Sequence, residues 1–326
     1  MRAVQLSGQG KAMALVNRVS RPPERATSRP ALERILVGVD FRQPSLAAAR
    51  WASTHFGSRT RIGLAHVRSV PEVPGFVKPM MPALDDRLER RAGSPLPGLR
   101  GFAATLGARD HSIHVRAGHT VSSLADMAGN LEADLVVLGR KAVDGNRGRT
   151  LERLIRRLNV PALVIGNGIE KRPRRILAAV DDAPIGRQVV DWAARLAQHF
   201  GAELILLHVL SEALLAHDWI SQARSREQTG SVGLGSSARW VPPAHAWLRG
   251  LGPTDGSPAV VRTMVAVGAV GPMILARARA ARADLIVVGR NGTHATGPDG
   301  DIGSATRLAL RGAQVPLLVV PATGPR

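Results

Sequence analysis

The sequence of 326 residues predicts an α/β protein made of two doubly wound, five-stranded parallel-sheet domains in one chain. Short runs of apolar, β-branched residues alternate with helical stretches, a pattern typical of βαβ units. The runs are apolar at nearly every position, as expected for parallel strands buried on both faces. The whole succession then occurs a second time, which indicates two copies of one domain.

The expected strands of the two copies correspond one to one. The first strand of each copy ends in aspartate, and the second ends in His-Val. The fourth strand carries Ala-Asp-Leu and ends in glycine, and the last begins with Val-Pro. In chain order the expected strands are 35–40, 63–67, 114–118, 133–139 and 160–165 in the first copy, and 176–181, 206–209, 264–268, 283–289 and 315–320 in the second.

The first helix is expected to be about one turn shorter in the first copy. There Phe56 lies five residues after Trp51, whereas in the second copy Phe200 lies eight residues after Trp192. Both tryptophans have Leu and Ala neighbours, so we expect them in the core. Further helices are expected at 122–131 and 272–282.

The repeat also sets the expected domain boundaries. We expect a basic tail at 1–30, the first copy at 31–168 and the second copy at 172–323. Each copy contains a Pro- and Gly-rich stretch, 71–101 or 211–258, which reads as loop with part of a helix. The tail has a net charge of +5 and no sustained apolar period, so we expect it to be mobile.

The composition excludes several classes of protein. Cysteine is absent, which excludes disulfides, thiolate catalysis and Cys-ligated zinc. No apolar run suffices for a membrane helix or a signal peptide, so we expect a cytoplasmic protein. The net charge is +19, and only four of the 44 basic residues are lysine. This excess reflects an arginine-rich solvated surface, or it attracts phosphates, nucleic acid or acidic lipid without specificity.

The second copy carries the clearer candidate site. Ligands of open parallel sheets bind at the carboxyl ends of the strands, and there this copy has a glycine-bearing loop that leads into a helix. Glycines let a phosphate approach the backbone amides, and a helix N-terminus favours an anion. The alternative is a tight turn with Ser304 as a plain N-cap. The candidate nucleotide-binding residues are Asp181, Val209, Gly268, Gly289, Arg290, Asn291, Gly292, Gly303, Ser304 and Ala305.

These features together resemble the universal stress protein family. The resemblance rests on strand–Asp, strand–His-Val, Ala-Asp-Leu-(Val/Ile)-Val-x-Gly, the Gly-x-x-Gly loop, Gly-Ser and a final Val-Pro-x-Leu-Val-Val strand, over nearly all of 31–322. It implies a Rossmann-like sheet of order 3-2-1-4-5 in each copy, an aspartate near adenosine and a glycine loop on the phosphates of ATP. It also implies pairing through the last strands, so that the two copies form an intramolecular pseudo-dimer.

The second copy departs modestly from the family's ATP-binding motif. The motif has nine residues between its second glycine and Gly-(Ser/Thr), whereas ten separate Gly292 from Gly303. Among them, Asp299 and Asp301 place negative charge near the expected phosphates. We expect them to repel phosphate, with coordination of a divalent ion as the alternative.

The first copy departs more. Ala142 replaces the second glycine of the motif, and only eight residues separate Gly139 from Gly148. We therefore expect the first copy to have lost tight ATP binding, because a Cβ blocks close approach and a short loop cannot wrap a triphosphate. The candidate weak site consists of Asp40, Val67, Gly139, Arg140, Gly148 and Thr150.

The expected function is a stress-response regulatory module that binds ATP or another adenine nucleotide, with or without Mg²⁺, mainly in the second copy. No catalytic residues and no metal site are expected, and His66 and His208 are interpreted as hydrogen-bonded core histidines. The alternatives are an interaction protein that has lost nucleotide binding, and a basic binder of nucleic acid or membrane surfaces. The expected partners are a second copy of the chain in a homodimer and an unidentified protein. A specific nucleic-acid site is not expected.

Overall fold

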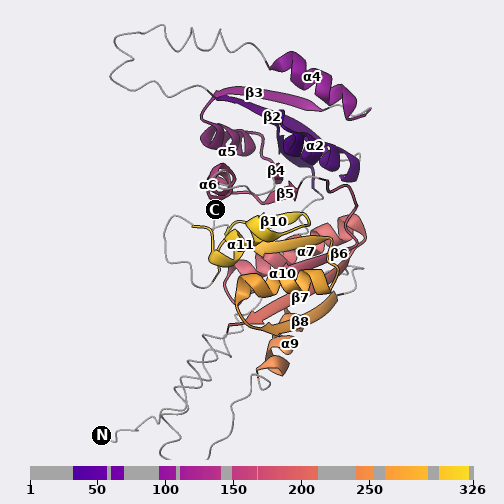
Figure 1. Ribbon diagram of the computed structural model, residues 1–326, viewed down its shortest axis with the longest axis vertical. Helices are drawn as coiled ribbons and strands as arrows, with labels where there is room; N and C mark the ends of the chain where they lie inside the picture. Colours follow the sequence, from indigo (N-terminus) through magenta and orange to yellow (C-terminus); the bar gives the residue numbers. More distant parts are fainter. Residues whose placement is uncertain are drawn as a thin grey trace, which may run out of the picture. The chain divides into compact units, whose positions relative to one another are not determined.

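The computed structural model describes residues 32–56, 60–69, 95–107, 111–140, 149–166, 168–211, 240–252, 261–292 and 301–322. The basic tail predicted at 1–30 lies outside these residues, as do Ala142, Gly148 and Asp299. In the described part of the chain, ten strands form one sheet in the order β3-β2-β1-β4-β5-β10-β9-β6-β7-β8 (Figure 1).

Each copy contributes a parallel sheet of order 3-2-1-4-5, as predicted. The first copy supplies β1 (Arg34–Gly38), β2 (Arg61–Ser69), β3 (Ser112–Gly118), β4 (Leu135–Arg140) and β5 (Ala162–Gly166). The second supplies β6 (Arg175–Ala179), β7 (Glu203–Leu210), β8 (Val261–Val267), β9 (Leu285–Gly289) and β10 (Leu317–Val320). β1 pairs with β2 and β4, and β6 pairs with β7 and β9. The strand order therefore reverses between β1 and β4, and again between β6 and β9.

The two sheets are joined by β5 and β10, which pair antiparallel. Leu163 lies opposite Leu318, and both side chains are fully buried. The last strand of each copy is therefore an interior strand of the combined sheet, because the other copy covers the edge that it would otherwise expose. The predicted pseudo-dimer is confirmed, and Figure 1 shows β10 beside β5 at its centre.

Helices cover both faces of the combined sheet. Successive strand residues point to opposite faces: Leu36 belongs to one apolar layer and Val37 to the other. Burial on both sides explains the continuous apolar runs of the sequence. One layer includes α2 (Gln43–His55), α4 (Leu96–Thr105), α7 (Ile185–Phe200) and α9 (Val241–Gly250). The other includes α5 (Thr120–Asn130), α6 (Arg149–Arg157), α10 (Val270–Ala280) and α11 (Ser304–Gly312).

The predicted difference in the first helix is confirmed, since α2 has 13 residues and α7 has 16. Trp51 is 2% exposed, as predicted for a core residue. Trp192 packs against the same apolar layer but is only half-buried, with Arg195 4.6 Å above its ring. The predicted core position is thus confirmed for Trp51 and only in part for Trp192.

The ends of α2 and α7 meet in a cluster of aromatic and histidine side chains. The ring of Phe56 lies 5.8 Å from that of Phe200 and 5.2 Å from that of His199. His199 donates through Nε2 to the carbonyl of His55 at 3.1 Å, which links the two copies directly. Burial lowers the pKa of His199; the hydrogen bond to His55 opposes this shift, and the positive charge of Arg172 adds to it.

None of the helices in the described ranges combines the length and the apolar character that a membrane crossing requires.

Stability is expected to fall in acid because of His199. The pKa of His199 is lowered in the folded protein, so the unfolded chain takes up the proton first as the pH drops below about 6.5. The free energy of unfolding should therefore be highest above that pH and decrease below it. Urea unfolding at about pH 7.5 and about pH 5.5 measures the difference.

His199→Gln keeps a donor for the His55 carbonyl but cannot titrate, so it should reduce the pH-dependent part of the stability. His119→Gln changes an exposed histidine and is the matched control. An equal loss of stability on acidification in the unmodified chain and in His199→Gln would contradict this assignment.

Candidate functional site

The second copy brings its predicted aspartate and glycine loop together where the strand order reverses. Asp181 follows β6. Gly289 is the last residue of β9, and the loop continues from it to Gly292. A Cβ on Gly292 would overlap Oδ2 of Asp181, so the carboxylate lies directly against the Gly292 backbone. Only glycine leaves room for this contact. The two residues predicted to meet adenosine and phosphate are thus neighbours in space.

The far end of the glycine loop returns to the same place. The amide of Gly303 donates to the carbonyl of Arg290 at 2.9 Å. A Cβ on Gly303 would lie 3.8 Å from the amide nitrogen of Gly292. Thr306 fixes the start of the loop, because its hydroxyl donates to the Gly289 carbonyl at 2.6 Å. Both described ends of the loop therefore lie side by side; residues 293–300 are outside the described chain.

Helix α11 begins at the end of this loop. Its N-cap is Gly303, and Ser304 is the exposed first residue of the helix. The alternative of Ser304 as the N-cap was therefore wrong. The first amides of a helix have no partner within it, which leaves them for a capping group, water or an anion. Ala305 is half-buried against α10, where a Cβ on Gly271 would lie 3.3 Å from its Cα.

The predicted residues of the adenosine end follow the neighbouring strands. Val209 is half-buried near the end of β7. Gly268 follows β8 and has a φ of +144°, which residues with a side chain rarely adopt. His208 donates through Nδ1 to the Val180 carbonyl at 2.8 Å, and the ring of Trp247 packs against it at 5.1 Å. His208 is hydrogen-bonded as predicted, but it is half-buried rather than in the core.

Arg290 reaches across to the first copy. Its Nη1 donates to the carbonyls of Arg156 and Leu158, both at 2.9 Å, at the C-terminal end of α6. Arg140 does the reverse: its guanidinium donates to the carbonyls of Leu310 and Ala313 at the end of α11. A helix C-terminus presents unpaired carbonyls and partial negative charge, which favour a cation.

The hydrogen bonds that Arg140 and Arg290 donate to the opposite copy are largely shielded from water. Arg290 is 7% exposed, and burial lowers the pKa of both guanidinium groups, although arginine stays protonated. Nε of Arg290 is buried without a hydrogen-bond partner among the described residues. The structure therefore directs both side chains into the contact between the copies.

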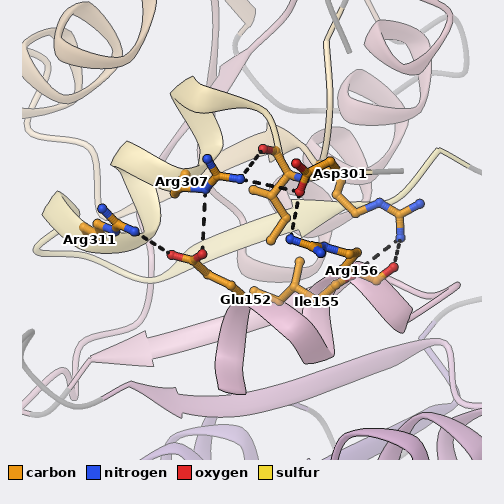
Figure 2. Close-up of polar contacts among 8 residues, drawn as sticks. Glu152, Ile155, Arg156, Asp301, Arg307 and Arg311 are labelled. Carbon is orange, nitrogen blue, oxygen red and sulfur yellow. Dashed lines mark hydrogen bonds and ion pairs between the residues drawn. The ribbon is translucent and has the colours of Figure 1, made fainter. Parts of the chain in front are cut away.

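Asp301 lies next to Gly303 and carries charge that the sequence analysis expected to repel phosphate. Its Oδ1 lies 2.8 Å from Nη2 of Arg156 and 3.4 Å from Nη2 of Arg307. Figure 2 shows Asp301 between these two arginines, one from each copy. The negative charge near the loop is thus offset by two positive charges, which weakens the reason for expecting repulsion.

Glu152 forms the other half of this ion-pair network (Figure 2). It lies 3.7 Å from Arg307 and 3.2 Å from Arg311, and its side chain is only 17% exposed. Glu152 and Arg307 are each the fourth residue of their nine-residue helices. Corresponding positions of the two copies thus carry opposite charges and contact each other.

The candidate site of the first copy is built differently. Asp40 follows β1, and its Oδ1 accepts from the Ser45 hydroxyl at 2.5 Å and the Arg42 amide at 3.0 Å. The second copy has Gly186 in place of Ser45 and lacks this hydroxyl. A Cβ on Gly139 would overlap the carbonyl of Pro44, so backbone fills the space between the ends of β1 and β4. In the second copy the side chain of Ile185 meets the corresponding Gly289 instead.

An aromatic ring packs on the strand-end histidine of the first copy. Phe41 follows Asp40 with a φ of +61°, an outlier for a bulky residue. Its ring lies 4.9 Å from that of His66, which donates to the Val39 carbonyl at 2.7 Å. A Cβ on Gly98 of α4 would lie 3.6 Å from the Phe41 ring. Val67 is half-buried beside His66, Thr150 is exposed on α6, and Gly148 is outside the described residues.

Sequence reasoning missed Phe41, Glu152, Arg156 and Arg307 as residues that shape the site. A signal for Glu152 and Arg307 was available, because the aligned last helices have opposite charges at the same position. For Phe41 there was none, since a positive φ cannot be read from a lone phenylalanine. Within the described residues, no group of three His, Asp or Glu side chains is arranged to hold a metal ion.

Comparison with known proteins identifies related folds. The family model described as the universal stress protein family matches residues 31–166 and 173–321. No curated protein matches the chain. A universal stress protein from Archaeoglobus fulgidus DSM 4304 is 16% identical, with a TM-score of 0.59 over 89% of this chain and 98% of that one. A functionally unknown protein from Pseudomonas aeruginosa PAO1 is also 16% identical, with a TM-score of 0.55 over 90% and 94%.

The reciprocal contacts of Arg140 and Arg290 predict equal losses of stability when either side chain is removed. Arg290→Met and Arg140→Met each leave helix carbonyls without a buried donor, so each should lower the free energy of unfolding by about 1–3 kcal/mol. Chemical denaturation of the full chain measures this. Arg157→Met, at an exposed position of α6, is the control and should change little. Unaltered stability in Arg290→Met would show that the contact between the copies does not depend on it.

Proposed function

The chain belongs to the universal stress protein family, and we propose that it binds ATP or a related adenine nucleotide in its second copy as a regulatory module of the stress response. The observation that carries this proposal is the contact of Asp181 with Gly292. The carboxylate of Asp181 would lie near the adenosine, and the backbone of Gly292 would lie near the phosphates. The two groups meet where the strand order reverses, which is where ligands of doubly wound sheets bind.

The residues present fit such a ligand. Gly292 is exposed, and Gly303 lies against it, so two backbone segments converge without Cβ atoms between them. Their amides and the Ser304 hydroxyl would hold phosphate oxygens. Oδ1 of Asn291 is buried without a hydrogen-bond partner among the described residues, and a ribose hydroxyl or adenine amino group would supply a donor. Mg²⁺ would enter with the phosphates and use few protein ligands.

The first copy would serve another role. Backbone of Pro44 fills its strand crossover, and Phe41 covers the strand-end histidine. These contacts support one nucleotide per chain. A cytoplasmic location remains a prediction from sequence.

The proposal predicts one ATP site per chain that depends on Gly292. In Gly292→Ala the new Cβ would overlap only the end of the Asp181 side chain, which can rotate away. The fold should therefore survive, while the carboxylate is displaced and the cradle narrows. ATP affinity should fall about tenfold or more, measured by isothermal titration.

Ser304→Ala should weaken ATP binding by about 10- to 150-fold in the same titration if the hydroxyl meets a charged oxygen.

A matched pair of variants assigns the site to one copy. Asp181→Asn should weaken ATP binding, whereas Asp40→Asn, the same change in the first copy, should leave it intact. Gly139 is unsuitable as a control, because any Cβ there would overlap backbone. A stoichiometry of two, or loss of binding in Asp40→Asn alone, would contradict the assignment. Absence of ATP binding by the unmodified chain would favour an interaction protein that has lost its nucleotide.

A further inference from the structure

We propose that the first copy positions the phosphate-binding loop of the second copy, and that Arg156 does so through Asp301. This inference rests on the proposed function, because it assigns a regulator to that same site. Arg156 is a positioning residue: its guanidinium pairs with Asp301 of the loop, and the loop would contact the ligand.

Both described ends of the loop are attached to helix α6 of the first copy. At the start, Arg290 donates to the carbonyls of Arg156 and Leu158. At the end, Asp301 pairs with Nη2 of Arg156 at 2.8 Å. The Gly303 amide then closes the loop on the Arg290 carbonyl. Helix α6 therefore holds the two chain segments whose amides would meet the phosphates.

The second copy completes the attachment with one arginine of its own. Nη2 of Arg307 lies 3.4 Å from Oδ1 of Asp301 and donates to the Ile302 carbonyl at 3.2 Å. The Ile302 amide donates to the same carboxylate oxygen at 2.8 Å. The residues just before Gly303 are thus fixed by one arginine from each copy, as Figure 2 shows for Arg156 and Arg307.

The described residues contain this ion pair to the loop in the second copy. Counted back from Gly148 and Gly303, the residue of the first copy that corresponds to Asp301 is Asn146, which has no charge and lies outside the described residues. Arg311 corresponds to Arg156, and it pairs with Glu152 of α6. The contact of Arg156 with Asp301, which we call the clamp, is therefore support that the first copy gives to the second.

The contact of Arg156 with Asp301 is expected to order the loop rather than to stabilise the fold. The side chains of Arg156 and Asp301 are 45% and 60% exposed, and exposed ion pairs contribute little to folding. A loop already held in its binding geometry, however, loses less entropy when the ligand arrives. The expected consequence is a change in phosphate affinity without a change in global stability.

The test is isothermal titration of the full chain with ATP and, separately, with adenosine. Arg156→Ala should weaken ATP binding by about 3- to 10-fold and leave adenosine binding unchanged, because the segment held by Asp301 leads into residues 303–305, which would meet the phosphates and not the adenosine. Arg156→Lys keeps the charge and should restore most of the affinity. Arg153→Ala changes an exposed arginine of the same helix and is the matched control.

Asp301→Asn separates positioning from direct attraction. If Arg156 acts through Asp301, this change weakens ATP binding, and the double variant Arg156→Ala with Asp301→Asn is no weaker than either single variant. If Arg156 instead attracts phosphate directly, releasing it from Asp301 strengthens ATP binding, and that result would overturn the inference.

Hydrogen exchange without nucleotide examines the clamp by itself. The amides of residues 302–305 should exchange faster in Arg156→Ala than in the unmodified chain and in Arg153→Ala. Unchanged exchange together with unchanged ATP affinity overturns the inference while the proposed function stands. Absence of ATP binding by the unmodified chain overturns the proposed function and this role of Arg156 with it, even where exchange reveals a clamp.

Discussion

The antiparallel pairing of β5 with β10 is the contact on which the rest of the molecule depends. Each copy ends in an apolar strand with one edge that its own sheet leaves unpaired, and such an edge is costly to expose. When the two edges meet, their backbone groups are satisfied and their side chains continue the apolar layers on both faces. Two small sheets thereby share one core, and burial per residue rises with the size of the folded unit.

This pairing brings α6 and α11 close enough to exchange charged groups. Each helix ends in carbonyls that its own turns cannot satisfy, and each receives an arginine from the opposite copy, Arg290 or Arg140. The same helices carry Glu152 and Arg307, whose charges would be alike if two identical domains were paired. Covalent linkage removes the requirement for symmetry, so corresponding positions in the two copies are free to become complementary.

The same freedom accounts for the different contacts at the strand ends of the two copies. In the first copy the backbone of Pro44 lies on Gly139 and Phe41 covers His66, so ordered protein fills the space between strand ends. In the second copy the carboxylate of Asp181 faces the Gly292 backbone. The two copies therefore differ in the groups that lie at the ends of their first and fourth strands.

The repeat, the extra turn of α7 and the placing of Asp181 near the glycine loop could be predicted from the residues of the chain. They follow from local patterns, because apolar runs fix the strands, spacing fixes helix length, and parallel strands carry their ends to one edge. The strand order came from the resemblance to the universal stress protein family. Three contacts became visible only in the folded chain: Arg290 caps a helix of the first copy, Arg156 pairs with Asp301, and the ring of Phe41 packs on His66. The partners that Arg290 and Asp301 find in the first copy lie more than a hundred residues away in the sequence. Their contacts exist only after the last strands pair, so no local pattern of the chain specifies them.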